Sequence, residues 1–319
     1  MAGSEPTRTP AAIPRAQDQL FAPGQSSRAK YAALVVGRPG LGALLKYELI
    51  VALAQARAGA LGLVLRKQLY PQLLGSCGRN VVFGQNVVLR HPHKIHIGNN
   101  VVIDDNCLVD AKGESNQGIR IGDGVFVGRN SILSCKNGDI ELANGANIGF
   151  NCEIFSASRV RIGASVLMAA YAYVIGGDHD FSNAEASVLE QGRVSAGVDV
   201  GDGAWLGAGA KVLDGVTIGA QAIIGAGAVV RTAIPERAIA VGVPAKVVST
   251  RTLGSAVDLG VGDAGALVVR PDGYVLARFD ADAETRHSLA SVARALSLRD
   301  RGRPGRFREP EAAQVMGSR

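Results

Sequence analysis

The sequence has few aromatic residues, which make up 5% of its 319 residues. It has four cysteines, and none of them forms a CxxC pair: Cys77, Cys107, Cys135 and Cys152. This spacing gives no support to a zinc site, so no metal is expected, and it fits a reducing cytoplasm. The N-terminus also lacks the basic-then-apolar pattern of a secretory signal peptide, so we expect a cytoplasmic protein.

The net charge of +6 is moderate, and many of the arginines lie near the C-terminus, between 294 and 308. Aromatic residues are not interleaved with these basic residues, as they are in proteins that stack on nucleic-acid bases. Nucleic acid is therefore not an expected partner. A phosphate-bearing ligand or an anionic membrane surface remains compatible with the charge.

Aliphatic residues recur at every sixth position, a period that neither a helix nor a flat strand produces. The longest ladder comprises Val200, Leu206, Val212, Ile218, Ile224 and Val230. The same spacing occurs earlier, for example at Ile97, Ile103 and Val109, and at Ile162, Met168 and Val174. This is the pattern of a hexapeptide parallel β-helix, in which each short strand contributes one inward aliphatic side chain.

Three such strands make one triangular coil, and stacked coils bury a continuous core along the axis. Glycine after a rung suits a corner where a side chain would clash or where φ is positive. We therefore predict a mainly β fold, a left-handed parallel β-helix over 76–250. The alternative is a β-sandwich with regular turns, which five consecutive six-residue steps disfavour.

The rest of the chain divides into three segments. Residues 1–38 are rich in Ala, Pro, Ser, Gly and Arg and are predicted to be disordered. Residues 251–319 are predicted to form a small α+β appendage, with a hairpin over 265–280, a helix over 282–298 and a disordered basic tail.

Residues 39–75 are predicted to be helical, but charged residues interrupt the apolar run within 40–74 too often for a membrane-spanning helix. One interpretation is a helical cap on the open end of the β-helix or across a subunit interface. The other is an interfacial helix at the inner face of a membrane.

The six-residue ladder breaks after Gly176 and resumes at Val200. Loops of this size inside a compact repeat are usually functional or mobile. His179 stands at the start of the break, between Asp178 and Asp180. A neutral imidazole there could act as a general base, held or tuned by a neighbouring carboxylate.

Three other histidines, His91, His93 and His96, lie close together before the regular coils. Alternation along a strand would place His91 and His93 on one face, so a metal site has to be weighed. The neighbouring Pro92 and the position outside the regular repeat favour a polar outer face instead.

Residues 78–250 resemble the hexapeptide-repeat O-acetyltransferases, a group that includes galactoside, maltose and polysaccharide acetyltransferases. Three stretches carry the resemblance: Gly149–Cys152, Val160–Gly163 with His179 nineteen residues after Val160, and Val200–Val248 with Trp205 and the closing sequence GVPAKVV.

The resemblance implies transfer of an acetyl group from acetyl-CoA to a hydroxyl of a sugar or cell-surface glycan precursor. His179 would be the general base, and Asn151 would position the acceptor. It also implies a homotrimer with coenzyme A between two subunits. The expected coenzyme A contacts are Trp205, Gly207, Ala208, Gly225, Ala226, Arg231, Lys246 and Arg251.

The chain departs from the family pattern at Thr232, where relatives carry lysine, and at Ser249, where they carry a phosphate-binding arginine. The assignment of the phosphate contacts among the three basic candidates therefore stays open. The acceptor also stays open: the same fold supports N-acyl transfer, serine O-acetylation and longer acyl donors. A zinc hydratase would need three histidines around the metal, and after His179 the next is His287. A non-catalytic scaffold would not bind acetyl-CoA.

Overall fold

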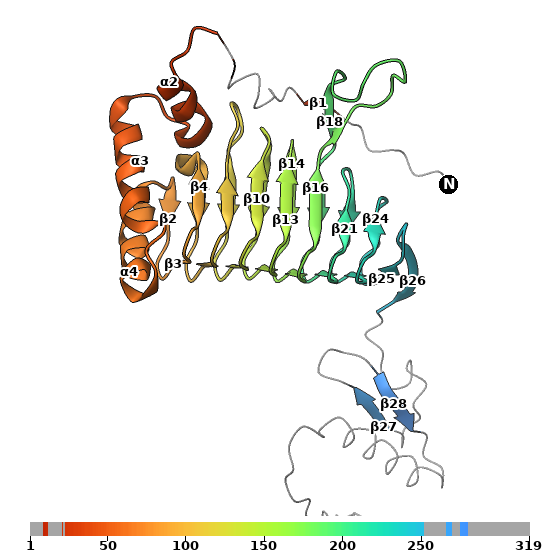
Figure 1. The fold of residues 1–319 in the computed structure, drawn as a ribbon. Helices are drawn as coiled ribbons and strands as arrows, with labels where there is room; N and C mark the ends of the chain where they lie inside the picture. The colour runs from red at the N-terminus through yellow and green to blue at the C-terminus, as the bar shows by residue number, and fades with distance from the viewer. Residues whose placement is uncertain (1–8, 12–20, 22, 252–265, 270–274, 280–319) are drawn as a thin grey trace, which may run out of the picture. The chain divides into compact units, whose positions relative to one another are not determined.

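The computed structural model describes residues 9–11, 21, 23–251, 266–269 and 275–279. Within this part, residues 1–251 form one compact unit and the strands after residue 252 belong to a second. The first unit is a parallel β-solenoid of about eight turns with helices at its N-terminal end (Figure 1). The predicted left-handed parallel β-helix is confirmed.

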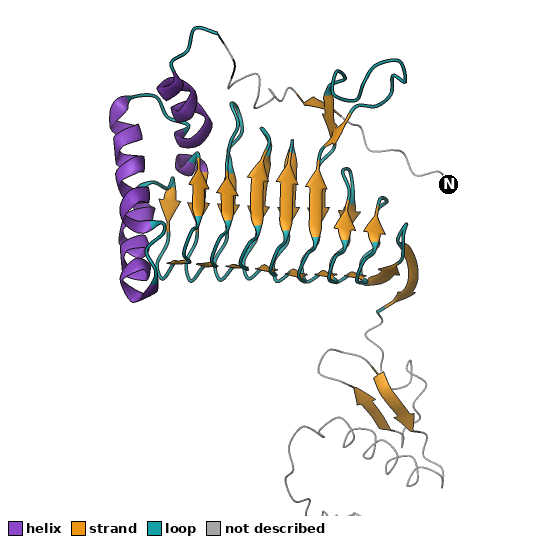
Figure 2. Ribbon diagram, viewed as in Figure 1, coloured by secondary structure: helices purple, strands orange, loops and turns teal. Residues whose placement is uncertain are grey.

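Three sheets, named I, II and III here, form the sides of the solenoid (Figure 2). Sheet I contains β2 (Ser76–Cys77), β5 (Ile95–Ile97), β8 (Ile119–Ile121), β11 (Asp139–Leu142), β14 (Arg159–Ile162), β19 (Val198–Val200) and β22 (Thr217–Ile218). Sheet II contains β3 (Val82–Phe83), β6 (Val102–Ile103), β9 (Phe126–Val127), β12 (Asn147–Ile148), β15 (Leu167–Met168), β20 (Trp205–Leu206), β23 (Ile223–Ile224), β25 (Ala238–Val241) and β26 (Lys246–Thr250). Sheet III contains β4 (Val88–Arg90), β7 (Leu108–Asp110), β10 (Ile132–Cys135), β13 (Glu153–Ser156), β16 (Tyr173–Gly176), β21 (Lys211–Val212) and β24 (Val229–Val230).

The rungs of the predicted ladder form the core of this solenoid. All six from Val200 to Val230 are buried, with at most 1% of each residue exposed. Val212 pairs with Val230, eighteen residues later, as three six-residue strands per coil require. Leu133 and Ile154 also pair, but twenty-one residues apart, because the earlier coils have longer corners.

The chain turns between sheets at three edges, called I–II, II–III and III–I here after the sheets they join. Asparagines with positive φ form several of these turns, and their side-chain amides bond from one coil to the next. Asn86 donates to Asn106, and Asn130 donates to Asn151, each over 3.1 Å. Asparagine tolerates the left-handed conformation, so the row stabilises the edge II–III.

The helices at the N-terminal end are α2 (Ser27–Tyr31), η1 (Ala32–Val36), α3 (Leu41–Ala54), α4 (Gly59–Leu69) and η2 (Tyr70–Gln72). They lie beside the first coil (Figure 1), where the buried Arg66 of α4 donates to the carbonyl of Phe83 over 2.9 Å. A further short helix, η3 (Pro92–Lys94), follows β4. No helix in the described ranges is long and apolar enough to span a bilayer.

The segment predicted to be disordered is corrected in part, because 27–36 form α2 and η1. Tertiary contacts order these residues: the Tyr31 hydroxyl donates to Glu48 over 2.6 Å, and His91 Nε2 lies 2.9 Å from the Ala33 carbonyl oxygen. The same contacts bury His91, which is only 6% exposed and is therefore not on a polar outer face.

In the second unit, β27 (Ala266–Val269) and β28 (Val275–Phe279) pair antiparallel. This pairing confirms the strands of the predicted hairpin. The predicted turn at 271–273, the helix over 282–298 and the basic tail lie outside the described residues.

Candidate active site

The break in the repeat is a hairpin that leaves the β-helix at the edge III–I. β17 (Asp178–His179) pairs antiparallel with β18 (Arg193–Ser195), which sets His179 opposite Arg193. The insertion explains why Val174 pairs with Val212, thirty-eight residues later. β1 (Thr9–Ala11) adds a third strand to this hairpin beside β18.

A set of hydrogen bonds closes the base of the hairpin. The Ser195 hydroxyl donates to the Gly176 carbonyl over 3.0 Å. The buried Asp214 accepts from the backbone N–H groups of Ala196 and Gly197, each over 2.9 Å. Sequence reasoning missed Asp214, because it lies in a corner between the rungs Val212 and Ile218 and leaves the apolar ladder unbroken. The coil therefore closes independently of the loop over 180–192.

A small cavity of about 150 Å³ borders His179. Phe155 and Tyr173 line its outer side, and their ring centroids lie 5.9 Å apart. The pKa of Tyr173 is raised, mainly because the phenol is partly buried. Lys136 and Arg193 also line the cavity. Aromatic faces beside cationic groups suit a ligand with an apolar face and negative charge.

The His179 side chain is half-buried, and no group among the described residues makes a hydrogen bond to its imidazole ring. The flanking carboxylates do not orient it, contrary to expectation. Asp178 accepts from the His179 backbone N–H over 2.8 Å, and Asp180 accepts from the Ser182 backbone N–H over 2.9 Å. Short polar side chains beside a turn often bond nearby backbone in this way. The imidazole is thus left available to an incoming group.

Asn151 lies far from His179 within one chain. It precedes β13, whereas His179 follows β16, and these parallel strands pair side by side. The two residues therefore stand at opposite ends of neighbouring strands, on edges II–III and III–I. Asn151 has a φ of 55° and accepts from Asn130, so its side chain belongs to the asparagine row of its edge.

Four expected coenzyme A contacts lie on the same edge as Asn151: Gly207, Ala208, Gly225 and Ala226. Packing between coils also favours glycine at these positions. A Cβ at Gly207 would lie 2.6 Å from the Ala226 nitrogen, so the close approach is to the next coil. Trp205 lies on sheet II between Leu167 and Ile223, and its buried indole nitrogen has no hydrogen-bond partner in the described structure.

The three basic candidates lie on separate edges, so the chain alone does not gather them into one phosphate site. Arg231 follows β24 at the edge III–I. Lys246 pairs with Val241, whose side chain lies against Gly225 on the edge II–III. Arg251 donates to the Gln221 carbonyl over 3.2 Å at the edge I–II. Only Lys246 is near the expected coenzyme A contacts.

The three early histidines also have separate surroundings. His96 Nδ1 lies 3.0 Å from the Ser76 hydroxyl, while His91 bonds the Ala33 carbonyl. Burial is the largest cause that lowers the pKa of His93, to about 4. No group of three or more His, Cys, Asp or Glu side chains in the described part of the chain is arranged to hold a metal ion.

Solved structures with a similar fold include three acyltransferases. AntD, an N-acyltransferase from Bacillus cereus in complex with dTDP and 3-hydroxybutyryl-CoA, is 23% identical, covers 56% of this chain and 84% of its own, and has a TM-score of 0.40. A maltose O-acetyltransferase from Clostridium difficile is 21% identical, with 66% and 86% covered and a TM-score of 0.38. A UDP-N-acetylglucosamine acyltransferase from Campylobacter jejuni is 18% identical, with 55% and 63% covered and a TM-score of 0.44.

Two comparisons of sequence agree with the repeat. Residues 197–232 match the family model of the bacterial transferase hexapeptide, six repeats. A Mycobacterium tuberculosis protein described as a "probable acetyltransferase" is 34% identical over 165 residues, which cover 52% of this chain and 54% of that protein. The chain thus spans about half the length of this curated relative. The chain carries the hexapeptide repeat of the bacterial transferases, and its resemblance to the hexapeptide-repeat acyltransferases is confirmed.

Proposed function

We propose that this chain is an acyltransferase that moves an acetyl group from acetyl-CoA to a hydroxyl of a sugar or glycan precursor. The observation that carries the proposal is the position of His179, on a hairpin that interrupts the β-helix and beside a cavity with an aromatic wall. The acetyltransferase relative and the hexapeptide match support the reaction class.

In this proposal the acceptor sugar occupies the cavity beside His179. The ring faces of Phe155 and Tyr173 cover its apolar side, and Arg193 and Lys136 attract a negative charge on the acceptor or its carrier. The substrate class is therefore an anionic sugar, such as a phosphate-linked precursor.

The unpaired imidazole of His179 accepts the proton of the acceptor hydroxyl as its oxygen attacks the thioester carbonyl. The new C–O bond replaces the C–S bond, and the proton passes to the departing sulfur of coenzyme A. Backbone N–H groups stabilise the oxyanion of the tetrahedral intermediate. Most of the gain in rate comes from holding both substrates in line.

A homotrimer explains why the two candidate catalytic residues lie apart in one chain. If the edge III–I of one subunit faces the edge II–III of the next, His179 meets Asn151 and the row from Gly207 to Ala226 across the interface. Apolar side chains on the edge II–III favour such a contact: Tyr171 is 67% exposed and Phe150 is 43% exposed. Coenzyme A would then lie along this edge towards Lys246.

The first experiment is titration of the full chain with acetyl-CoA by calorimetry, followed by acetyl transfer to a panel of sugar alcohols and amino sugars. His179→Ala should lower kcat at least a hundredfold, within the range of general-base catalysis, while acetyl-CoA still binds. Leu189→Ala, an exposed change in the same loop, is the matched control. Absence of acetyl-CoA binding in the wild type would remove the acyltransferase proposal, and preference for amino sugars would replace O-transfer by N-transfer.

Mixed subunits test the shared site. His179→Ala and Asn151→Ala chains, each inactive alone, should regain about a quarter of the wild-type activity when co-expressed, because a quarter of the interfaces then join two intact residues. An inactive mixture that still forms trimers would show that the two residues do not act across an interface.

A further inference from the structure

The outer face of α3 is apolar and uncovered in the described structure. Leu41, Leu45, Leu49 and Leu53 follow one another at every fourth position and are between 43% and 61% exposed. The opposite face packs on the β-helix through Tyr47, Ile50 and Ala54, which are buried. A helix that is apolar on both faces is stable in water only when both are covered.

The neighbouring helix α4 also carries exposed aliphatic side chains. Leu61 is 66% exposed and Val64 is 50% exposed, while Gly62 and Arg66 on its inner side are buried. With Leu63, which is 45% exposed, seven large aliphatic side chains are exposed on these two helices, where single exposed residues would be ordinary. We call residues 23–75 with this surface the helical cap.

Nearly all charged residues of the helical cap are basic. It has a single carboxylate, Glu48, which accepts a 2.6 Å hydrogen bond from the Tyr31 hydroxyl. Its seven basic residues are Arg28, Lys30, Arg38, Lys46, Arg57, Arg66 and Lys67. Of these, Arg66 is buried and Lys30 is partly buried, and the other five are exposed. An apolar surface bordered by positive charge fits an anionic amphiphilic partner.

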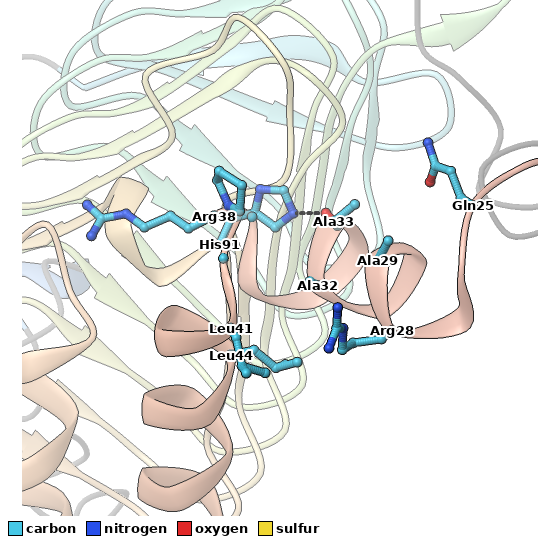
Figure 3. Close-up of a pocket in the computed structure, with 12 residues that line it drawn as sticks. Gln25, Arg28, Ala29, Ala32, Ala33, Arg38, Leu41, Leu44 and His91 are labelled. Atoms are coloured by element: carbon cyan, nitrogen blue, oxygen red, sulfur yellow. Dashed lines mark hydrogen bonds between the residues drawn. The ribbon is translucent and has the colours of Figure 1, made fainter.

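A pocket of about 590 Å³ lies at one end of this surface (Figure 3). Arg28 and Gln25 line it from the α2 side, Leu41 and Leu44 line it from α3, and His91 lines it from the β-helix. Figure 3 shows Arg38 extending away from His91 at its rim. Basic groups therefore lie directly beside the first leucine of the exposed row.

We propose that the helical cap docks on the surface of a bilayer that contains anionic phospholipids. The leucines of α3 enter the boundary between headgroups and acyl chains, and Arg28 and Arg38 contact lipid phosphates. A second copy of the chain is a poorer occupant of this surface, because two caps face to face would oppose charges of one sign. This docking is independent of the reaction at His179.

The test is flotation of the full chain with vesicles of phosphatidylcholine, with and without phosphatidylglycerol. The wild type should float with the phosphatidylglycerol vesicles and lose binding as salt rises, because the Debye length shortens. Arg28→Glu with Arg38→Glu should weaken binding at least about twentyfold, since each basic residue contributes about 1 kcal/mol near such a surface. Leu45→Glu with Leu49→Glu should abolish it.

Two matched controls separate the face from general effects. Leu189→Glu changes an equally exposed leucine in the loop after His179, and Arg120→Glu changes an exposed arginine of sheet I. Both should float like the wild type. Wild-type protein that stays unbound with phosphatidylglycerol would overturn the proposal. So would leucine variants that float normally, or that change the oligomeric mass in light scattering, which would assign the face to a subunit contact.

Discussion

Replacement of Asp214 is expected to loosen the hairpin that carries His179 without unfolding the β-helix. Its carboxylate is 6% exposed and accepts from two backbone N–H groups, those of Ala196 and Gly197, at 2.9 Å. Hydrogen bonds to a charged group contribute about 1.5–3 kcal/mol each. Asp214→Ala should therefore cost about 3 kcal/mol for local opening, and Asp214→Asn about half of that, because one acceptor oxygen remains.

Hydrogen exchange is the suitable assay, because coils of a solenoid can open without global unfolding. Exchange at the Ala196 and Gly197 amides should accelerate about a hundredfold in Asp214→Ala, since 1.4 kcal/mol corresponds to a factor of ten. Glu141→Ala serves as the control: it breaks a 3.3 Å ion pair with Arg159 in which both side chains are exposed, so its effect should stay below about 1 kcal/mol. Unchanged exchange at the two amides would show that Asp214 does not hold the base of the hairpin closed.

Three further outcomes follow from residues of the β-helix and its first coil. Gly207→Ala should lower stability by about 1–3 kcal/mol in thermal unfolding, because its Cβ would lie 2.6 Å from the Ala226 nitrogen, and an unchanged melting temperature would contradict this packing. His93 has a folded pKa near 4, below its usual value of 6.5, so the unfolded state binds more protons between these values. Stability should thus fall as pH drops from about 6.5 to 4, and His93→Gln should flatten this slope in melts at several pH values. Cys107 is buried, which raises its pKa to about 11, whereas Cys77 is only half-buried. Iodoacetamide should therefore modify Cys77 first in the native protein, as judged by peptide mass spectrometry.

The six-residue ladder was enough to predict the β-helix, because strand pairing repeats the same local geometry in each coil. Leu206 and Val230 are buried because each occupies the inward position of its six-residue repeat, which is the position that defined the ladder in the sequence. The helical turns over 27–36 could not be predicted in this way. Their order depends on tertiary partners, Glu48 and His91, which no local pattern reveals.

The candidate site was predictable only where it breaks the repeat. His179 stood out because the ladder stops beside it, and the structure places it on a hairpin next to a cavity. Asn151 and the basic residues were assigned from the family resemblance, and the triangular coil sends neighbouring segments of the chain to different edges. Arg231 and Arg251 therefore lie on separate edges, and which edge each residue reaches depends on the number of residues in every preceding turn.

The two ends of the solenoid are closed in different ways, and this bears on fibre formation. Every sheet of a parallel β-helix ends in an unpaired strand that another molecule could extend. At one end the helices cover the first coil, and at the other β26 folds back antiparallel onto β25. A chain that ends before Lys246 would expose β25 and should stack end to end into filaments. The last strand thus acts as a stop against polymerisation, a constraint separate from any binding of substrate.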